Sequence, residues 1–442
     1  MTTTLRTGIL ILMAPLIALA APGDLHGILV NRVDEGKKAT GIVVGTIDSN
    51  RHSITAYPAS LDGDTVFEIG SITKVFTSLL LADMVERGEV KLDDPVSKFL
   101  PASVKVPSQG PRQITLLDLS MQISGLPRLP TNMKPADPAN PYADYTPQKL
   151  YEFLSGYTLT RDIGSKYEYS NLAVGLLGHA LALKAGMSYE DLLRKRILEP
   201  LGMTSTTITL TPALQKRLAP GHNTALEPVK NWDLDALAGA GAIRSTANDM
   251  LKFLAANLEL TDTPLKAALR RMRSVEKETG VPDLDIAMAW HIWKKYGVTI
   301  YWHNGGTAGY RSFAGFDLVK KKGVVVLCNT FHEIDDIGLN WLEPQFPVAK
   351  FEAPKIRTEI TLDPQLLDTY VGEYQLSPTF AIKITREENR LFAQATGQPK
   401  FEIYAEKPNE FFLKVVDAQI TFEAAGLILH QGGMNQKATK VK

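Results

Sequence analysis

The spacing of hydrophobic and polar residues along the chain divides it into segments with different expected secondary structure. Apolar-rich runs at 41–48 and 53–57 flank the polar residues 49–51, which predicts two antiparallel strands joined by a turn. From residue 71 to about residue 256 the apolar positions recur with helical spacing, interrupted by long proline-rich loops. This second stretch therefore predicts a mainly helical region.

Strand-like apolar runs return after the helical region, at residues 298–302, 312–319 and 323–328. Strands that precede and follow a helical stretch can join in one sheet. The sequence therefore predicts an α+β fold, with an antiparallel sheet flanked by helices and a helical subdomain inserted between its first and last strands. A functional site is expected where the sheet and the subdomain meet.

One loop within the helical region, residues 126–138, is unusually long and rich in proline. Long irregular loops in compact domains are often functional. Two interpretations stay open from the sequence. The loop forms a wall of a substrate cleft, or it is a surface excursion.

The C-terminal part of the chain has a different pattern. Three prolines within 343–354 favour an extended linker. Short strand-like runs separated by turns follow it, at residues 381–385, 390–395, 410–415 and 419–423. They predict a small antiparallel barrel or sandwich. The expected divisions are a leader at 1–21, a main domain at 22–342, a linker at 343–358 and a C-terminal domain at 359–442.

The first residues resemble a secretory signal peptide. Arg6 precedes an apolar run from Gly8 to Ala21, which ends in small residues. The run is short for a membrane span, and no later segment reaches 18 uninterrupted apolar residues. We therefore expect an exported protein, periplasmic or secreted, with no membrane span after cleavage. An uncleaved anchor or a disordered tail is the alternative.

Composition restricts the classes of function. The 442 residues include 48 basic and 48 acidic side chains, a formal net charge of zero, and no basic run suggests a nucleic-acid partner. Cys328 is the single cysteine, so an intramolecular disulfide is excluded, and its apolar surroundings predict a buried strand residue. No HExxH motif or Cys/His cluster supports a metalloenzyme. We expect neither a metal nor an organic cofactor.

The pair Ser71 and Lys74 carries the first chemical signal. Positions i and i+3 share a helix face, so the amine can reach the hydroxyl. A serine needs a base to act as a nucleophile, and lysine can serve when burial lowers its pKa from about 10.4. Gly70 allows a sharp entry before the serine. The alternative is that Ser71 only caps a helix and Lys74 lies on the surface.

A second Ser-x-x-Lys occurs at Ser274 and Lys277. It stands in a strongly charged stretch, 270–278, without a glycine before the serine. This pattern predicts a solvated helix face. We therefore expect Ser274 to be inert.

Two further motifs complete the candidate site. Tyr169 and Asn171 precede an apolar helical run, and His303-Asn-Gly305-Gly306 ends a predicted strand. Taken alone, Asn171 is an ordinary N-cap, Tyr169 a buried aromatic residue and His303 a structural histidine. A second His-x-Gly, at His430, predicts a hairpin turn near the C-terminus.

Together, these motifs resemble the serine β-lactamase and penicillin-binding-protein superfamily, in particular its class C-like hydrolases, D-aminopeptidases, DD-peptidases and family VIII carboxylesterases. The supporting phrases lie at residues 66–74, 88–96, 114–120, 123–127, 198–203 and 240–249. The likeness spans roughly residues 25–331. It implies a β-lactamase/transpeptidase-like fold. The segment that starts at Leu367 resembles the lipocalin-like barrel found on some D-aminopeptidase relatives.

The resemblance also implies a role for each residue. Ser71 would be the nucleophile, Lys74 its activating partner and Tyr169 the group that passes a proton to the leaving group. Asn171 would hold the substrate amide and the lysine in place.

The strand motif would serve binding. The backbone N–H groups of Ser71 and Gly306 would form the oxyanion hole beside Gly305. His303 would stand where many relatives have the lysine of a Lys-Thr-Gly strand. A histidine is only partly charged near neutral pH. This departure favours peptidases and esterases over dedicated β-lactamases.

Three hypotheses follow. The first is an exported serine hydrolase that forms an acyl-enzyme on Ser71 and cleaves amides or esters, such as D-residue peptides, peptidoglycan fragments or small esters. The second is a class C-like β-lactamase acting on β-lactams. The third is a non-catalytic penicillin-binding or scaffolding relative. The sequence does not indicate an oligomeric state.

Overall fold

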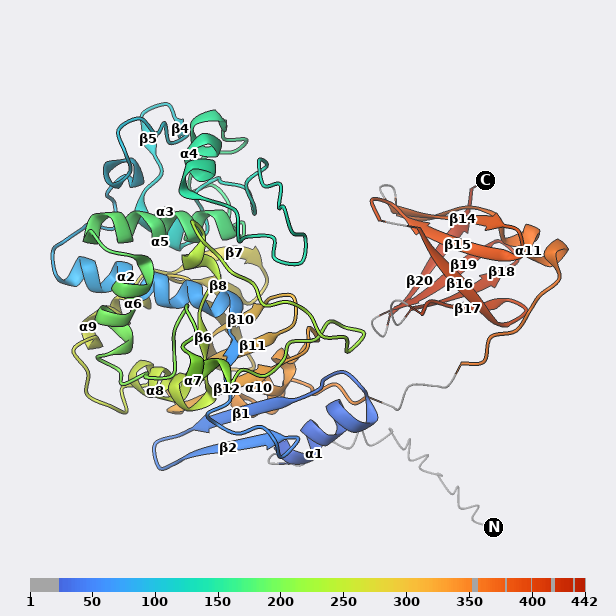
Figure 1. Ribbon diagram of the computed structural model, residues 1–442, viewed down its shortest axis with the longest axis horizontal. Coiled ribbons are helices and arrows are strands. Elements are labelled where there is room, and N and C mark those ends of the chain that lie inside the picture. The colour runs from blue at the N-terminus through green and yellow to red at the C-terminus, as the bar shows by residue number, and fades with distance from the viewer. Residues whose placement is uncertain are drawn as a thin grey trace, which may run out of the picture.

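The computed structural model describes residues 24–351, 357–377, 380–398, 400–414, 418–431 and 434–441. Figure 1 shows its elements from the blue N-terminal strands to the red C-terminal barrel. The expected signal peptide at 1–21 lies outside the described residues, and so does part of the expected linker, 352–356.

An eight-stranded antiparallel sheet forms the centre of the main domain, in the order β2-β1-β12-β11-β10-β9-β8-β7. Its strands are β1 (Ile42–Ile47), β2 (His52–Tyr57), β7 (Lys277–Val281), β8 (Leu284–Ile286), β9 (His291–Lys295), β10 (Val298–Gly306), β11 (Arg311–Asp317) and β12 (Lys322–Cys328). Because β1 pairs with β12, the strands from the two ends of the region join as expected. The sequence did not predict β7, β8 and β9.

The middle strands are apolar on both faces because helices cover both. On β12, Val324 and Val326 pack in the cluster that also holds Leu29 of helix α1 (Leu25–Val30). Helix α10 (Asp335–Leu342) packs on the same face. The alternate residues, Val325 and Leu327, join the main core. This alternation follows the period-two geometry of a strand.

The inserted region is mainly helical, as expected. Its helices are α2 (Thr73–Glu86), α3 (Leu116–Ser120), α4 (Pro147–Gly156), α5 (Asn171–Ala185), α6 (Tyr189–Leu193), α7 (Pro212–Gln215), α8 (Ala247–Asn257) and α9 (Lys266–Met272). Two short strand pairs accompany them, β3 (Phe67–Glu68) with β6 (Arg244–Ser245) and β4 (Ser108–Gln109) with β5 (Arg112–Gln113).

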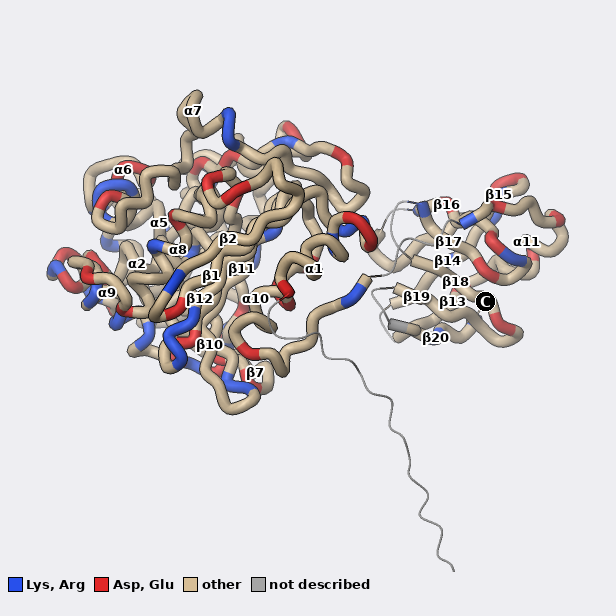
Figure 2. The backbone as a smooth tube through the Cα atoms, turned by 90° about the horizontal axis from the view of Figure 1, so that it is seen from below, with Lys and Arg blue, Asp and Glu red and all other residues tan. Residues whose placement is uncertain are grey.

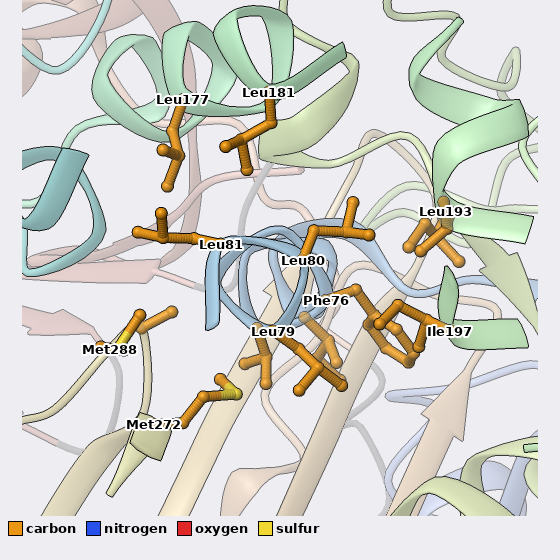
Figure 3. Close-up of a cluster of buried hydrophobic side chains, with 14 of the residues drawn as sticks. Phe76, Leu79, Leu80, Leu81, Leu177, Leu181, Leu193, Ile197, Met272 and Met288 are labelled. Atoms are coloured by element: carbon orange, nitrogen blue, oxygen red, sulfur yellow. The ribbon is translucent and has the colours of Figure 1, made fainter. Parts of the chain in front are cut away.

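Helix α2 is the centre of the hydrophobic core. Leu79, Leu80 and Leu81 point in different directions around its axis, and each is fully buried. Figure 3 shows Leu177 and Met272 among the side chains from other elements that surround it. A helix that is apolar on all sides must be surrounded by other elements. The residues at the start of α2 are therefore held on a rigid element.

The C-terminal residues form a closed antiparallel barrel, so the barrel expectation is confirmed and the sandwich is not. Its strands are β13 (Gly372–Ser377), β14 (Phe380–Glu387), β15 (Arg390–Ala395), β16 (Lys400–Lys407), β17 (Glu410–Phe412), β18 (Ala418–Glu423), β19 (Gly426–Gln431) and β20 (Met434–Lys440). Helix α11 (Pro364–Tyr370) packs on it, with Tyr370 stacked on Phe422 at 4.3 Å between ring centroids. His430 precedes the β19–β20 turn, and Gly432 lies outside the described residues.

The described parts of segment 343–358 are attached at their ends. Phe351 exchanges two hydrogen bonds with Asn31, at 2.9 and 3.1 Å. At the other end Arg357 forms an ion pair with Glu406 of β16. Neither contact tests the linker boundaries, which stay predictions.

The second Ser-x-x-Lys does not lie on a helix, so that expectation is wrong. Helix α9 ends at Met272, and Lys277 begins β7. The Ser274 hydroxyl donates to the Arg271 carbonyl at 2.9 Å, and the Lys277 amine donates to the Gly164 carbonyl at 2.5 Å. The Lys277 amine and the Ser274 hydroxyl therefore bind different backbone carbonyls.

Basic and acidic positions are interspersed over the main domain and the barrel (Figure 2). Within the part of the chain that the structure describes, no single helix is long and apolar enough to cross a membrane. The pair Asn171–Ala185 and Tyr189–Leu198, bent by 81°, meets the length and composition criteria only when taken together.

Candidate active site

Ser71 lies on a 3₁₀ turn, Gly70–Ile72, that leads directly into α2. Gly70 has φ +50°, and a Cβ there would stand 2.7 Å from the backbone nitrogen of Gly306. Only glycine fits this close approach. The residues that precede the turn and α2 are Ile69 and Ile72, and neither makes a side-chain cap. The interpretation of Ser71 as a helix cap is therefore wrong.

Lys74 is fully buried, with no exposed surface, so the surface interpretation is also wrong. Its amine lies 2.8 Å from Ser71 Oγ and donates to the carbonyl of Ala240 at 2.6 Å. Burial, followed by the charge of Arg128, lowers the pKa of Lys74 well below its usual 10.5. A neutral amine has a lone pair that can accept the serine proton.

Tyr169 stands beside this pair. The Lys74 nitrogen lies over its ring at 4.9 Å from the centroid, and the Arg128 guanidinium carbon lies over it at 5.1 Å. Burial raises the pKa of Tyr169 above its usual value, while a hydrogen bond with Ser71 opposes the rise. The phenol therefore keeps its proton at neutral pH, as a proton donor requires.

Asn171 is the first residue of α5 and not its cap. Ser170 is the cap, because its hydroxyl accepts from the backbone N–H of Ala173 at 2.9 Å. The Asn171 amide donates to the Tyr142 hydroxyl at 3.3 Å, and its buried Oδ1 has no hydrogen-bond partner among the described residues. This oxygen can accept an N–H group of a substrate. Asn171 makes no hydrogen bond to Lys74, whose amine is held by Ala240.

The end of β10 packs against the serine turn. A Cβ on Gly305 would lie 2.0 Å from the carbonyl oxygen of Ile69, so this position needs glycine. The hydroxyl of Ser312, opposite Gly305 on β11, donates to the same oxygen at 2.8 Å. These contacts bring the backbone of Gly306 beside the serine turn. The oxyanion hole stays a prediction supported by this placement.

His303 is buried and neutral, which corrects the expectation of partial charge. It is 1% exposed, and its Nδ1–H donates to the carbonyl of Asn304 at 2.6 Å. Burial, followed by the nearby His291 and Lys74, lowers the pKa of His303 well below 6.5. A neutral imidazole cannot supply the positive charge that a lysine at this position would supply.

His291 and Tyr167 extend the site, and no sequence motif marked them. His291 Nε2 lies 2.8 Å from the Tyr167 hydroxyl, and its ring centroid lies 5.0 Å from that of His303. Burial lowers the pKa of His291 to about 4. Both histidines are therefore neutral at physiological pH.

The start of the proline-rich loop contacts residues at the beginning of α5, and Tyr142 follows the loop. The carbonyls of Pro127 and Arg128 accept from the Ser170 hydroxyl at 2.6 Å and the Asn171 N–H at 3.0 Å. Tyr142 packs on Trp232, with 5.2 Å between ring centroids. These contacts place the start of the loop beside the site, and both interpretations of the rest of the loop stay predictions.

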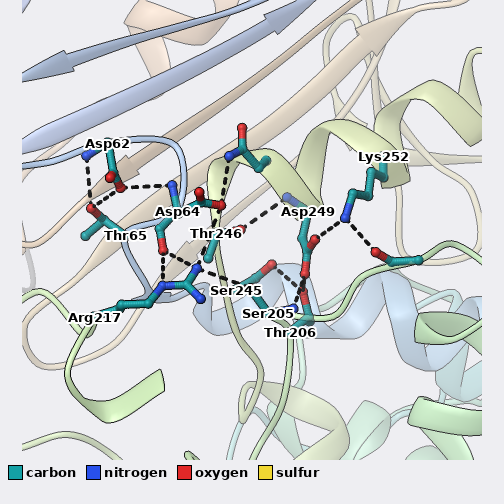
Figure 4. Close-up of polar contacts among 12 residues, drawn as sticks. Asp62, Asp64, Thr65, Ser205, Thr206, Arg217, Ser245, Thr246, Asp249 and Lys252 are labelled. Atoms are coloured by element: carbon teal, nitrogen blue, oxygen red, sulfur yellow. Dashed lines mark hydrogen bonds and ion pairs between the residues drawn. The ribbon is translucent and has the colours of Figure 1, made fainter. Parts of the chain in front are cut away.

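A buried ion pair supports the strand that leads to Ser71. Arg244 of β6 contacts Glu68 of β3 at 3.3 Å, and both side chains are less than 10% exposed. Farther along, Asp249 of α8 accepts from the backbone N–H of Ser205 at 2.7 Å and from Thr206 (Figure 4). These contacts fix β6 and α8 to the loops around them.

Among the described residues, no group of three or more histidine, cysteine, aspartate or glutamate side chains is placed to hold a metal ion. The expectation that no cofactor is needed stays a prediction.

Comparisons with known families match two parts of the chain. The family model described as "Beta-lactamase" matches residues 29–343. A model described as "Domain of unknown function (DUF3471)" matches residues 357–429.

Individual relatives agree with the first match. D-alanyl-D-alanine-carboxypeptidase/endopeptidase AmpH of Escherichia coli K12 is 34% identical over 226 residues, 50% of this chain and 57% of that protein. This chain therefore spans little more than half the length of that relative. Penicillin-binding protein 4* of Bacillus subtilis is 26% identical over 86% of this chain and 89% of its own length.

A solved structure shows the same fold. The β-lactamase/D-alanine carboxypeptidase of Yersinia pestis, complexed with citrate, is 26% identical with a TM-score of 0.61. The alignment covers 73% of this chain and 99% of that chain.

Proposed function

The chain belongs to the β-lactamase family; from that premise we propose that it is a serine hydrolase, which forms an acyl-enzyme on Ser71 and hydrolyses amide or ester bonds. The observation that carries the proposal is the 2.8 Å approach of a fully buried Lys74 amine to Ser71 Oγ. Burial lowers the pKa of this amine and so favours its neutral form, and its position lets it act as a base.

The proposed acylation uses the side chains of Ser71, Lys74 and Tyr169 together with two backbone N–H groups. Ser71 Oγ attacks the substrate carbonyl while its proton moves to Lys74. The negative charge that develops on the carbonyl oxygen faces the backbone N–H groups of Ser71 and Gly306, in the manner of an oxyanion hole. As the carbon–nitrogen or carbon–oxygen bond breaks, Tyr169 protonates the leaving group and regains a proton from Lys74. Water then hydrolyses the ester on Ser71.

We propose peptides with D-residues, such as peptidoglycan fragments, or small esters as substrates. One relative is named as a D-alanyl-D-alanine carboxypeptidase and endopeptidase, which supports a peptide substrate. The unpaired Oδ1 of Asn171 offers an acceptor for a peptide N–H. Export to the periplasm or medium is part of the same proposal, because the apolar leader precedes the domain.

Hydrolysis of β-lactams is the second candidate. Several relatives, from bacteria such as Escherichia coli and Providencia stuartii, are named β-lactamases. The neutral His303 does not supply the positive charge that the lysine of a Lys-Thr-Gly strand would offer to the carboxylate of a β-lactam. This difference favours the peptidase or esterase function.

A parallel assay distinguishes the candidates. The purified protein and Ser71→Ala would be given a p-nitrophenyl ester, D-alanine p-nitroanilide and nitrocefin. Ester or D-amide turnover well ahead of nitrocefin is the expected result. Nitrocefin hydrolysis ahead of the other two would establish a β-lactamase. Binding of all three substrates without turnover would indicate the non-catalytic alternative.

A further inference from the structure

Arg128 is an exposed cation at the edge of the Ser71–Lys74–Tyr169 site. We propose that its guanidinium recognises a carboxylate of the substrate, so that the enzyme prefers anionic esters and amides. This inference rests on the proposed function, because it names the class of substrate for the same site.

The position of Arg128 places its charge among the reacting groups. Its guanidinium carbon lies 5.1 Å from the centre of the Tyr169 ring, and the Lys74 amine lies 4.9 Å from the same centre. Its backbone carbonyl accepts from the N–H of Asn171 at 3.0 Å, which fixes the base of the side chain to the start of α5. A substrate acylating Ser71 therefore passes within reach of this guanidinium.

Arg128 also has no carboxylate partner within the described residues. Its guanidinium forms no ion pair or hydrogen bond there, and it lies over the Tyr169 ring. The nearest acidic residue in sequence to Tyr169, Glu168, is paired with Arg161 at 2.7 Å. A guanidinium offers five N–H donors in a planar fork that matches a carboxylate. All five remain available for a ligand.

The other basic groups near the site are neutral or already paired with an acidic residue. Lys74 is buried and neutral when it acts as a base, and His303 and His291 are neutral at physiological pH. Arg311, opposite Gly306 on β11, is paired with Glu333. Among the basic residues named here, Arg128 is thus the permanent charge without an acidic partner in the described part of the chain.

The test compares esters that differ only in charge. One pair is mono-(4-nitrophenyl) succinate and its methyl ester, which place or remove a carboxylate on the acyl chain. A second pair is 3-carboxy-4-nitrophenyl acetate and its methyl ester, which do the same on the leaving group. The measured quantity is the ratio of kcat/KM for the charged ester to that for its neutral partner, in wild type, Arg128→Gln and Arg128→Lys.

We expect a wild-type ratio above one in at least one pair. Arg128→Gln should lower that ratio by about tenfold or more, the size of a hydrogen bond to a charged group. Arg128→Lys should retain part of it, because the charge stays while the fork is lost. Raising the salt concentration should lower the ratio in wild type and leave it unchanged in Arg128→Gln. The pair that responds shows whether the carboxylate belongs to the acyl chain or the leaving group.

Lys134→Gln is the matched control. Lys134 is an exposed lysine in the same loop, so this variant removes the same charge without touching the site, and the ratio should not change. The neutral esters test for a purely structural role of Arg128. If Arg128 only held Tyr169 in place, Arg128→Gln would lower kcat/KM for charged and neutral esters alike.

Each outcome bears on one claim. An unchanged ratio in Arg128→Gln, or an equal loss for both members of each pair, overturns the assignment of Arg128 while the serine mechanism stands. An equal loss in Lys134→Gln also overturns it, because the effect would then be nonspecific. Ester hydrolysis that persists in Ser71→Ala instead overturns the proposed function itself.

Discussion

The carbonyl oxygen of Ala240 accepts a hydrogen bond from Lys74 Nζ at 2.6 Å, from a position 166 residues away in the chain. The carbonyl belongs to a 3₁₀ turn, Ala238–Ala240, which residues 241–243 connect to β6. This contact fixes the position of the amine without placing a negative charge beside it. A carboxylate at this place would stabilise the ammonium form and raise the pKa, whereas a carbonyl and burial leave a neutral base beside Ser71.

Removal of this base should slow acylation strongly. Lys74→Ala is expected to lower the rate of covalent labelling by a fluorophosphonate by about 10²- to 10⁴-fold, the usual contribution of a general base. Labelling reactions quenched at successive times and measured by mass spectrometry of the intact protein would give the rate. Lys277→Ala, from the second Ser-x-x-Lys, is the control and should label at the wild-type rate. Equal rates in wild type and Lys74→Ala would remove Lys74 from the mechanism.

The acylation rate should depend on pH through Lys74. Its folded-state pKa is lowered well below 10.5, and only the neutral amine can accept the serine proton. The labelling rate should therefore rise with pH as Lys74 loses its proton and reach a plateau well below pH 10.5. Labelling rates of the wild-type protein across this range would show the transition. A rate that first rises near pH 10 would mean that Lys74 is not desolvated.

The close approach of β10 to the serine turn depends on Gly305. Gly305→Ala would place a methyl group 2.0 Å from the Ile69 carbonyl, and a backbone atom cannot move aside without moving Ser71. We expect a stability loss of at least about 1–3 kcal/mol and a large loss of labelling. Urea denaturation and labelling rates would measure both.

Gly156→Ala provides the control for the glycine substitution. A Cβ at position 156 meets nothing within 4 Å, so stability and labelling should stay near those of wild type. Comparable effects of the two substitutions would show that the contact between Gly305 and Ile69 is not tight.

The substrate preference should not follow the titration of a histidine. His303 and His291 are neutral because they are buried, with the pKa of His291 at about 4. The ratio of kcat/KM for a carboxylated ester to that for its neutral methyl ester should be flat between about pH 5.5 and 8.5. A ratio that falls as pH rises through 6 to 7, and that no longer does so in His303→Gln, would show that His303 carries charge and binds the carboxylate.

Much of the site could be predicted because it is encoded by local spacing. Ser71 and Lys74 are one helical turn apart, and Tyr169 and Asn171 stand directly at the start of a helix. Such short-range relationships survive in the sequence pattern. The hydrogen-bond partner of Lys74 could not be predicted in the same way. Every residue has a backbone carbonyl, so no residue type marks this partner, and Ala240 is distant from Lys74 in sequence.

In the fold, too, some elements could be predicted from the local sequence and others could not. The apolar strands β1 and β12 are buried on both faces and were predicted, whereas β7 was missed. Most of β7 is exposed, and its lysine, glutamate and glycine are atypical of a strand. The neutral state of His303 also depends on burial by residues from other elements, which its own motif does not contain.

The most direct test of the central claim is to locate the covalent adduct. The protein would be labelled with a fluorophosphonate, digested and mapped by mass spectrometry, with Ser71→Ala and Ser274→Ala treated in parallel. The account predicts one adduct on the peptide that contains Ser71, absent from Ser71→Ala and retained in Ser274→Ala. An adduct on another residue, or labelling that persists in Ser71→Ala, would contradict it.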